Sequence, residues 1–178
     1  MPRLFTALEV PTRDAERLAM LRAPLAGARW VDPDNYHITL RFIGDVDGPT
    51  ADAFVEQIAD IKARPIELQL SGIGYFGNRK PRTLWVGVKA DQDINHLHAA
   101  HERAAQRAGL RPESRKYSPH VTIARLSGTR PKAITPILEA YGQFEGTPFA
   151  ATRFVLFSSR PGSGGGPYVI EEAFSLSE

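Results

Sequence analysis

The chain has 178 residues, 42% of them hydrophobic, and its formal net charge is only +2, although its isoelectric point is about 9.0. This length and composition predict one globular unit with a buried core and exclude a disordered chain. The absence of cysteine excludes disulfide bonds, a thiolate nucleophile and cysteine-based zinc or iron–sulfur sites.

Hydropathy along the chain argues against a membrane protein. The N-terminus MPRLFTALEV has no apolar run of signal-peptide length, and no segment approaches the roughly 20 apolar residues that cross a bilayer. The lack of cysteine fits a reducing compartment. We therefore expect a cytoplasmic protein without a membrane partner, whose mild basicity matters for an anionic ligand only where it is concentrated.

Periodicity and turn residues predict a mixed order of elements. Extended segments are expected at 3–10, 30–43, 66–71, 83–90, 119–126, 152–158 and 168–174, and helices at 13–25, 50–61, 92–108 and 132–141. The glycine-rich stretches GIGYFGNRKPR (72–82) and RPGSGGGP (160–167) are predicted to be loops. Because strands and helices do not alternate regularly, we expect an α+β fold with largely antiparallel pairing.

Two short words in the predicted strands are nearly the same, YHITL at 36–40 and PHVTI at 119–123. Side chains alternate between the two faces of a strand. His37 and Thr39 therefore share one face, and His120 and Thr122 share the corresponding face of the second strand. One H-x-T motif is common enough to be structural, but two copies at the same parity suggest two similar lobes. If these lobes pack against each other, the polar faces of the two strands can meet across a cleft.

These residue types suit phosphate chemistry. Histidine has an ordinary pKa near 6.5, so one imidazole can act as a base and the other as an acid near neutral pH. Threonine hydroxyls can donate hydrogen bonds to the non-bridging oxygens of a phosphate held between the strands.

HITL and HVTI resemble the paired H-x-T-x motifs of the 2H phosphoesterase superfamily. Three longer stretches, WVDPDNYHITLRFIGDV, YFGNRKPRTLWVGV and RKYSPHVTIARL, are similar in order to regions of the RNA 2′,3′-cyclic phosphodiesterases, historically called 2′-5′ RNA ligases. The resemblance covers most of the chain. It implies one bilobal domain over residues 1–178, with both motifs lining a central cleft and helices packed outside, acting on RNA with a 2′,3′-cyclic phosphate end or on a related nucleotide. We expect a monomer.

The resemblance also implies roles for individual residues. His37 would donate a proton and His120 would accept one, while Thr39 and Thr122 would hold the phosphate oxygens, with no cofactor and no metal. The product would carry a 2′-phosphate. Arg125 matches a basic position that contacts phosphate in the family.

Strand alternation gives different expectations for two arginines, Arg125 and Arg41. On an ideal strand Arg125 lies opposite to His120, so a bulge or a strand end would have to turn it toward the cleft. Arg41 has the same parity as His37 and could reach the cleft directly.

Other candidates are weaker. His96, His98 and His101 do not converge well on a helix, which disfavours a metal site and favours a solvated helix face.

The basic group Arg79, Lys80 and Arg82 could follow an RNA backbone or be merely solvated. Tyr75 or Phe76 could stack on a base, although core packing is the commoner role of such aromatics. RPGSGGGP lacks the lysine and hydroxyl of a phosphate-binding loop and could be a hairpin or a flap.

Two other functions remain open from the sequence. The cleft could belong to a non-catalytic nucleotide- or RNA-binding module, although such a module has no need of both proton-transfer groups. The same site could also run in reverse and ligate RNA ends through a 2′-5′ linkage.

Overall fold

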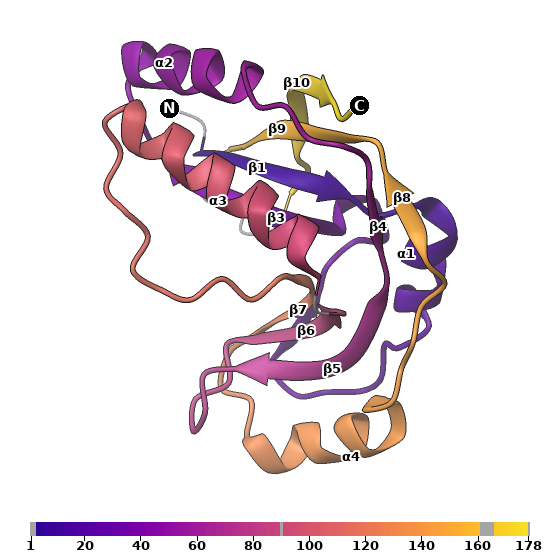
Figure 1. Ribbon diagram of the computed structural model, residues 1–178. Helices are drawn as coiled ribbons and strands as arrows, with labels where there is room; N and C mark the ends of the chain where they lie inside the picture. Colours follow the sequence, from indigo (N-terminus) through magenta and orange to yellow (C-terminus); the bar gives the residue numbers. More distant parts are fainter. Residues whose placement is uncertain (1–2, 90, 161–165, 178) are drawn as a thin grey trace.

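The computed structural model describes residues 3–89, 91–160 and 166–177, and it confirms an α+β fold with antiparallel strand pairing (Figure 1). The strands are β1 (Arg3–Glu9), β2 (Ala28–Trp30), β3 (His37–Gly44), β4 (Ile66–Leu68), β5 (Leu70–Phe76), β6 (Thr83–Val88), β7 (His120–Leu126), β8 (Phe149–Ala151), β9 (Arg153–Ser159) and β10 (Val169–Ser175). The helices are α1 (Thr12–Ala19), α2 (Gly48–Ala59), α3 (Gln92–Arg107) and α4 (Pro131–Tyr141), with a 3₁₀ turn at Pro33–Asn35.

One sheet runs through the molecule in the strand order β10-β9-β1-β3-β7-β6-β5, with β2 also paired to β7. Strands β10, β9, β1 and β3 form the first lobe, and β7, β6, β5 and β2 form the second lobe. A single antiparallel bridge, Ile38↔Val121, joins the lobes between β3 and β7. Because β9 and β10 come from the end of the chain, the lobes are not simply its two halves.

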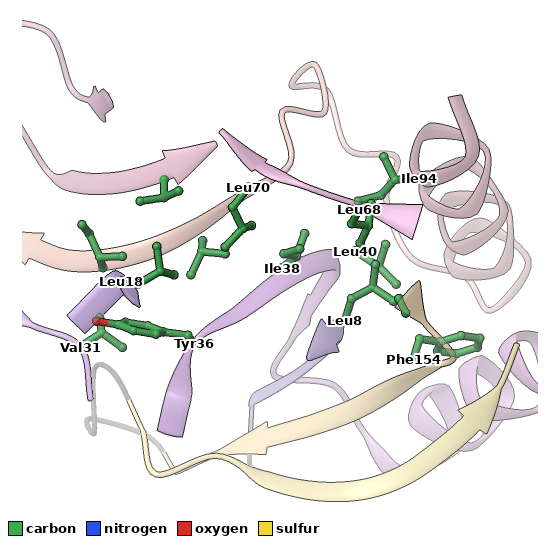
Figure 2. Close-up of a cluster of buried hydrophobic side chains, with 14 of the residues drawn as sticks. Leu8, Leu18, Val31, Tyr36, Ile38, Leu40, Leu68, Leu70, Ile94 and Phe154 are labelled. Atoms are coloured by element: carbon green, nitrogen blue, oxygen red, sulfur yellow. The ribbon is translucent and has the colours of Figure 1, made fainter. Parts of the chain in front are cut away.

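One continuous hydrophobic core lies under both lobes, and α3 covers its part behind the first lobe. Helix α3 is capped by Asp91, whose side chain accepts hydrogen bonds from the first-turn backbone N–H groups, as a helix N-cap does. Its buried face carries Ile94 and Leu97, and Figure 2 shows Ile94 close to Leu40 and Leu68 of the strands. This packing fixes β3 from behind and leaves its other face to the second lobe.

Several boundaries differ from the expectations. The prediction of a loop at 72–82 is wrong in its first part, because residues 73–76 pair with β6 and extend β5 to Phe76. The first helix ends at Ala19 rather than at residue 25. The extended segment 30–43 is broken by the 3₁₀ turn, where the Asp32 side chain accepts a hydrogen bond from the Asp34 N–H.

Candidate active site

The two H-x-T strands have the same shape. From His37 to Phe42 the exposure is half-buried, buried, half-buried, buried, buried, exposed, and the same order runs from His120 to Arg125. A register shift causes the two consecutive buried positions in each strand. In β3 it falls between the pairs Thr6↔Arg41 and Ala7↔Thr39, and in β7 between Leu84↔Ala124 and Trp85↔Thr122. Each strand thus carries a one-residue bulge that reverses its parity.

The bulges decide where the two arginines lie. After the bulge in β7, Arg125 returns to the face of His120 and Thr122, where its charge acts on both His37 and His120. After the bulge in β3, Arg41 turns to the opposite face and is only 8% exposed. The structure therefore places Arg125 beside the histidines, as a bulge would require, and contradicts the expectation that Arg41 could reach the cleft.

Each histidine is fixed by a carbonyl two residues earlier. His37 Nδ1 lies 2.8 Å from the carbonyl oxygen of Asn35, and His120 Nδ1 lies 2.7 Å from that of Ser118. A carbonyl can only accept, so Nδ1 carries the hydrogen in both rings. Each Nε2 is then the nitrogen available for proton transfer.

The hydroxyls lie beside these rings. His37 Nε2 is 3.1 Å from Thr39 Oγ1. Continuing the antiparallel register by one residue from the Ile38↔Val121 bridge sets His37 next to Thr122, and His120 next to Thr39. The four predicted side chains therefore come together where the two lobes meet.

Aromatic rings surround both imidazoles. The His37 ring has its centroid 4.9 Å from that of Phe5 and 5.2 Å from that of Tyr168. The His120 ring lies 5.0 Å from Phe76 and 6.3 Å from Trp85. Phe76 thus lies beside His120, and its role in stacking on a base stays a prediction. Tyr168 and Trp85 are far from both motifs in the sequence, so strand parity did not point to them.

This environment disfavours charged imidazoles. Burial, together with the charges of Arg125 and His120, lowers the pKa of His37 to about 4, against a raising effect of the Asn35 hydrogen bond. Burial and Arg125 also lower the pKa of His120. Without a bound anion both rings are neutral near pH 7. A neutral imidazole can act as a base, but an imidazole that acts as an acid must first bind a proton.

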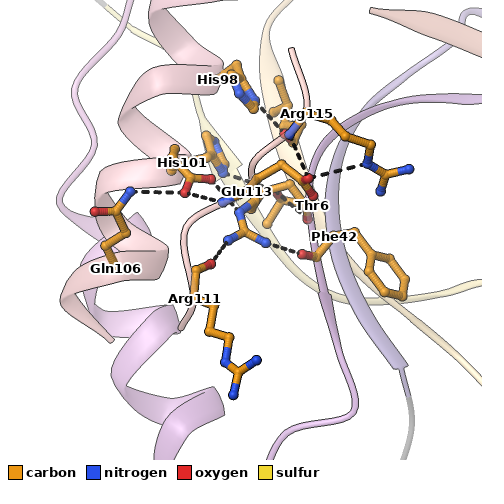
Figure 3. A network of polar contacts seen from close by, with 11 residues as sticks. Thr6, Phe42, His98, His101, Gln106, Arg111, Glu113 and Arg115 are labelled. Carbon is orange, nitrogen blue, oxygen red and sulfur yellow. Dashed lines mark hydrogen bonds and ion pairs between the residues drawn. The ribbon is translucent and has the colours of Figure 1, made fainter. Parts of the chain in front are cut away.

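Behind β3 lies a polar network that the sequence analysis did not anticipate (Figure 3). The Arg41 guanidinium donates to the Glu102 carboxylate at 2.6 Å and to the carbonyl oxygens of Phe42 and Arg111. The Tyr117 hydroxyl donates to the carbonyl oxygen of Thr39 at 2.8 Å. These contacts hold the backbone of the first motif around its bulge.

Two of the three helix histidines, His98 and His101, belong to this network. His98 Nδ1 lies 2.8 Å from the carbonyl oxygen of Leu40, and its ring stacks on Tyr117. His101 is fully buried and lies 2.9 Å from Thr6 Oγ1. The expectation of a solvated helix face therefore holds only for the exposed His96. Among residues 3–89, 91–160 and 166–177, no group of three or more His, Cys, Asp or Glu could hold a metal ion.

The remaining candidates lie outside the site or outside the described residues. Arg79, Lys80 and Arg82 are exposed around the β5–β6 turn, and Tyr75 is half-buried beside the core. Most of RPGSGGGP, residues 161–165, lies outside the described residues, so its role as a hairpin or a flap stays a prediction.

In the part of the chain that the structure describes, no helix has the length and apolar character needed to cross a membrane.

Comparison with known proteins gives a consistent family. The family model described as LigT like Phosphoesterase matches residues 8–85 and residues 86–168. An RNA 2′,3′-cyclic phosphodiesterase from Aeropyrum pernix is 36% identical over 136 residues, which cover 72% of this chain and 77% of that protein. One of the same name from Aquifex aeolicus is 30% identical over 153 residues, covering 83% and 81%.

Solved structures agree with the fold. The crystal structure of E. coli LigT complexed with 3′-AMP has a TM-score of 0.80 and 26% identity, and the match covers 100% of both chains. A structure described as a phosphoesterase reaches a TM-score of 0.82 at 24% identity, also over 100% of both chains. The match of the family model to both halves of the sequence confirms the resemblance drawn from HITL and HVTI: the chain belongs to the LigT-like phosphoesterases of the 2H superfamily.

Proposed function

We propose that this protein hydrolyses the terminal 2′,3′-cyclic phosphate of RNA to a 2′-phosphomonoester by paired histidine acid–base catalysis, without a metal ion. The relatives named RNA 2′,3′-cyclic phosphodiesterase support the substrate and the reaction. The observation that carries the mechanism is the pair of imidazoles, each with Nδ1 tied to a carbonyl, on two strands that are bridged at Ile38 and Val121.

The proposed steps follow in-line displacement at phosphorus. His120 Nε2 takes a proton from the attacking water, and His37 Nε2 gives a proton to the departing ribose 3′ oxygen on the opposite side. Thr39, Thr122 and Arg125 bind the non-bridging oxygens and stabilise the charge that develops on them. Breaking the 3′ bond leaves the phosphate on the 2′ oxygen.

The low pKa of His37 gives substrate binding a second role. The bound phosphate is an anion, and a nearby negative charge raises the pKa of an imidazole. His37 therefore takes up its proton with the substrate rather than holding it in the free protein. Burial, and then the charge of Arg125, lowers the pKa of His120, which favours the neutral imidazole that a base needs.

The test is incubation with an oligoribonucleotide ending in a 2′,3′-cyclic phosphate, in excess EDTA, with the product identified by ³¹P NMR. We expect turnover to a 2′-phosphate. Binding without turnover would favour the binding module. A 3′-phosphate would reverse the assignment of the histidines, and activity lost to EDTA but restored by a divalent ion would indicate a metal-activated water. Adding RNA with a free 5′ hydroxyl measures any 2′-5′ ligation.

A further inference from the structure

A row of apolar side chains crosses the cleft face of the first lobe. Phe42 of β3 pairs with Phe5 of β1, Phe5 pairs with Phe157 of β9, and Phe157 pairs with Ile170 of β10. Cross-strand partners lie side by side on one face of a sheet. Phe5 and Phe157 both contact the His37 ring, so this apolar row borders the site.

The two ends of the row are open to solvent. Phe42 is 51% exposed and Ile170 is 44% exposed, and both are among the few exposed large hydrophobic residues. Figure 3 shows the Phe42 ring on the side of β3 away from α3. The bulge at Leu40 and Arg41 puts it there, because Arg41 faces α3 and the next residue must face the cleft. No core contact explains an exposed phenylalanine at this place.

The second lobe shows what this position can do. By strand register Phe42 corresponds to Arg125, the sixth residue counted from each histidine. In the second lobe the corresponding row of cross-strand neighbours is Arg125, Thr83 and Phe76. Its first residue is charged, whereas the first residue of the row in the first lobe is aromatic. The two ends of one cleft therefore offer a cation and a flat apolar surface.

A nucleoside phosphate has the same two parts, a charged phosphate and a flat base. A strand advances about 3.3 Å per residue, so Phe42 lies about 10 Å along β3 from Thr39, which is on the scale of one nucleoside. Aromatic side chains stack on bases of any sequence because every base has a π face.

We propose that Phe42, at the exposed end of the row Phe42–Phe5–Phe157–Ile170, is the stacking surface for the base of the nucleotide that carries the cyclic phosphate. This inference rests on the proposed function, since it assigns the other end of the same substrate. It places the base against the first lobe, next to the phosphate that Thr39, Thr122 and Arg125 hold between the lobes.

The test compares two substrates that differ only in the base. One is adenosine 2′,3′-cyclic phosphate, and the other is methyl ribofuranoside 2′,3′-cyclic phosphate, which has none. We expect the wild type to prefer the nucleoside in kcat/KM by about 5- to 100-fold, the range that stacking on one base supplies. Phe42→Ala should lose this preference while keeping its activity on the substrate without a base. Phe42→Trp should retain the preference.

The matched control is Val169→Ala. Val169 is 55% exposed and adjoins Ile170, so it projects from the opposite face of β10, and its loss should leave the preference unchanged. An equal loss on both substrates in Phe42→Ala, or no loss on either, overturns the proposal. A change of oligomeric state in Phe42→Ala with an unchanged preference assigns Phe42 to a protein interface instead.

A separate measurement distinguishes failure of this inference from failure of the proposed function. If the wild type hydrolyses neither substrate, calorimetric titration with adenosine 2′-phosphate and with ribose 2-phosphate still reports on Phe42. Weaker binding of the nucleotide alone in Phe42→Ala supports the stacking surface. Equal binding by both proteins overturns it.

Discussion

The motif strand of the first lobe has the sequence HITLRF and that of the second lobe has HVTIAR. The main difference between the two sequences is the position of the arginine. In the first word arginine is fifth, and in the second it is sixth. The bulge after the threonine sends the fifth side chain behind the sheet and the sixth into the cleft. A shift of one position therefore turns an arginine that binds a helix into one that faces the histidines.

The difference continues behind the sheet. In the first lobe the bulge pairs Thr6 with Arg41, and both make polar contacts to α3 through His101 and Glu102. At the same place in the second lobe Leu84 pairs with Ala124, and both are fully buried. At the bulge, the first lobe is polar behind and carries Phe42 in front, whereas the second lobe is apolar behind and carries Arg125 in front. The same backbone can thus give each side of a cleft a different chemistry.

The strongest test of this division is the pair of histidines, which the two lobes have in common. His37→Ala and His120→Ala should each lower kcat by about 10²–10⁴-fold, because each removes a proton-transfer group that acts in the transition state. Steady-state kinetics with a cyclic-phosphate oligonucleotide measures the effect, and circular dichroism measures whether the fold persists. Near-normal turnover in His120→Ala would contradict the assignment, and unfolding of that variant would show that the histidine is structural.

The next largest effect concerns stability and separates the two arginines. Arg41→Met should lower the free energy of unfolding by about 2–4 kcal/mol, because it breaks three hydrogen bonds and leaves the largely buried Glu102 carboxylate without its cation. Denaturant titration gives this value. The matched control is Arg3→Met, whose ion pair with Asp45 is more than half exposed and should be worth less than about 1 kcal/mol. Equal losses in the two variants would show that the polar network does not stabilise the bulge.

Arg125 should behave in the opposite way, with a small effect on stability and a larger one on activity. Arg125→Gln should lower kcat/KM by about 10- to 100-fold, the range expected for losing a hydrogen bond to a charged phosphate. Because the Arg125 charge lowers the pKa of His37 and of His120, the variant should raise both pKa values, which imidazole proton NMR can follow. Arg125→Lys retains the charge and should leave both pKa values low. A fall of either pKa in Arg125→Gln would place the guanidinium elsewhere.

How far the sequence could predict this site depends on the bulges. Strand parity placed His37, Thr39, His120 and Thr122 on shared faces, because all four precede the extra residue of their strand. It failed at Arg41 because no local signal in LRF marks the place where alternation breaks. Burial of His101 was equally invisible, since it depends on Thr6 from a distant strand. The residues before each bulge were therefore predictable from strand alternation, and the residues whose orientation depends on the bulge were not.

The last prediction tests the polar network behind the first lobe by pH. Burial, and then the charge of His98, lowers the pKa of His101 to about 3, whereas an unfolded chain has an ordinary histidine pKa near 6.5. The neutral ring therefore contributes stability that is complete above about pH 6.5 and is lost as the pH falls toward 3, where the unfolded chain binds the extra proton first. One such proton changes the free energy of unfolding by up to about 1.4 kcal/mol per pH unit. His37, whose pKa is also lowered, contributes to the same pH dependence of stability. The contribution of His101 is therefore the difference in pH dependence between the wild type and His101→Asn, a variant that keeps a polar atom near Thr6. Unfolding curves between pH 4 and pH 8 should show a shallower loss in the variant, and parallel curves would mean that His101 takes up its proton in the folded protein.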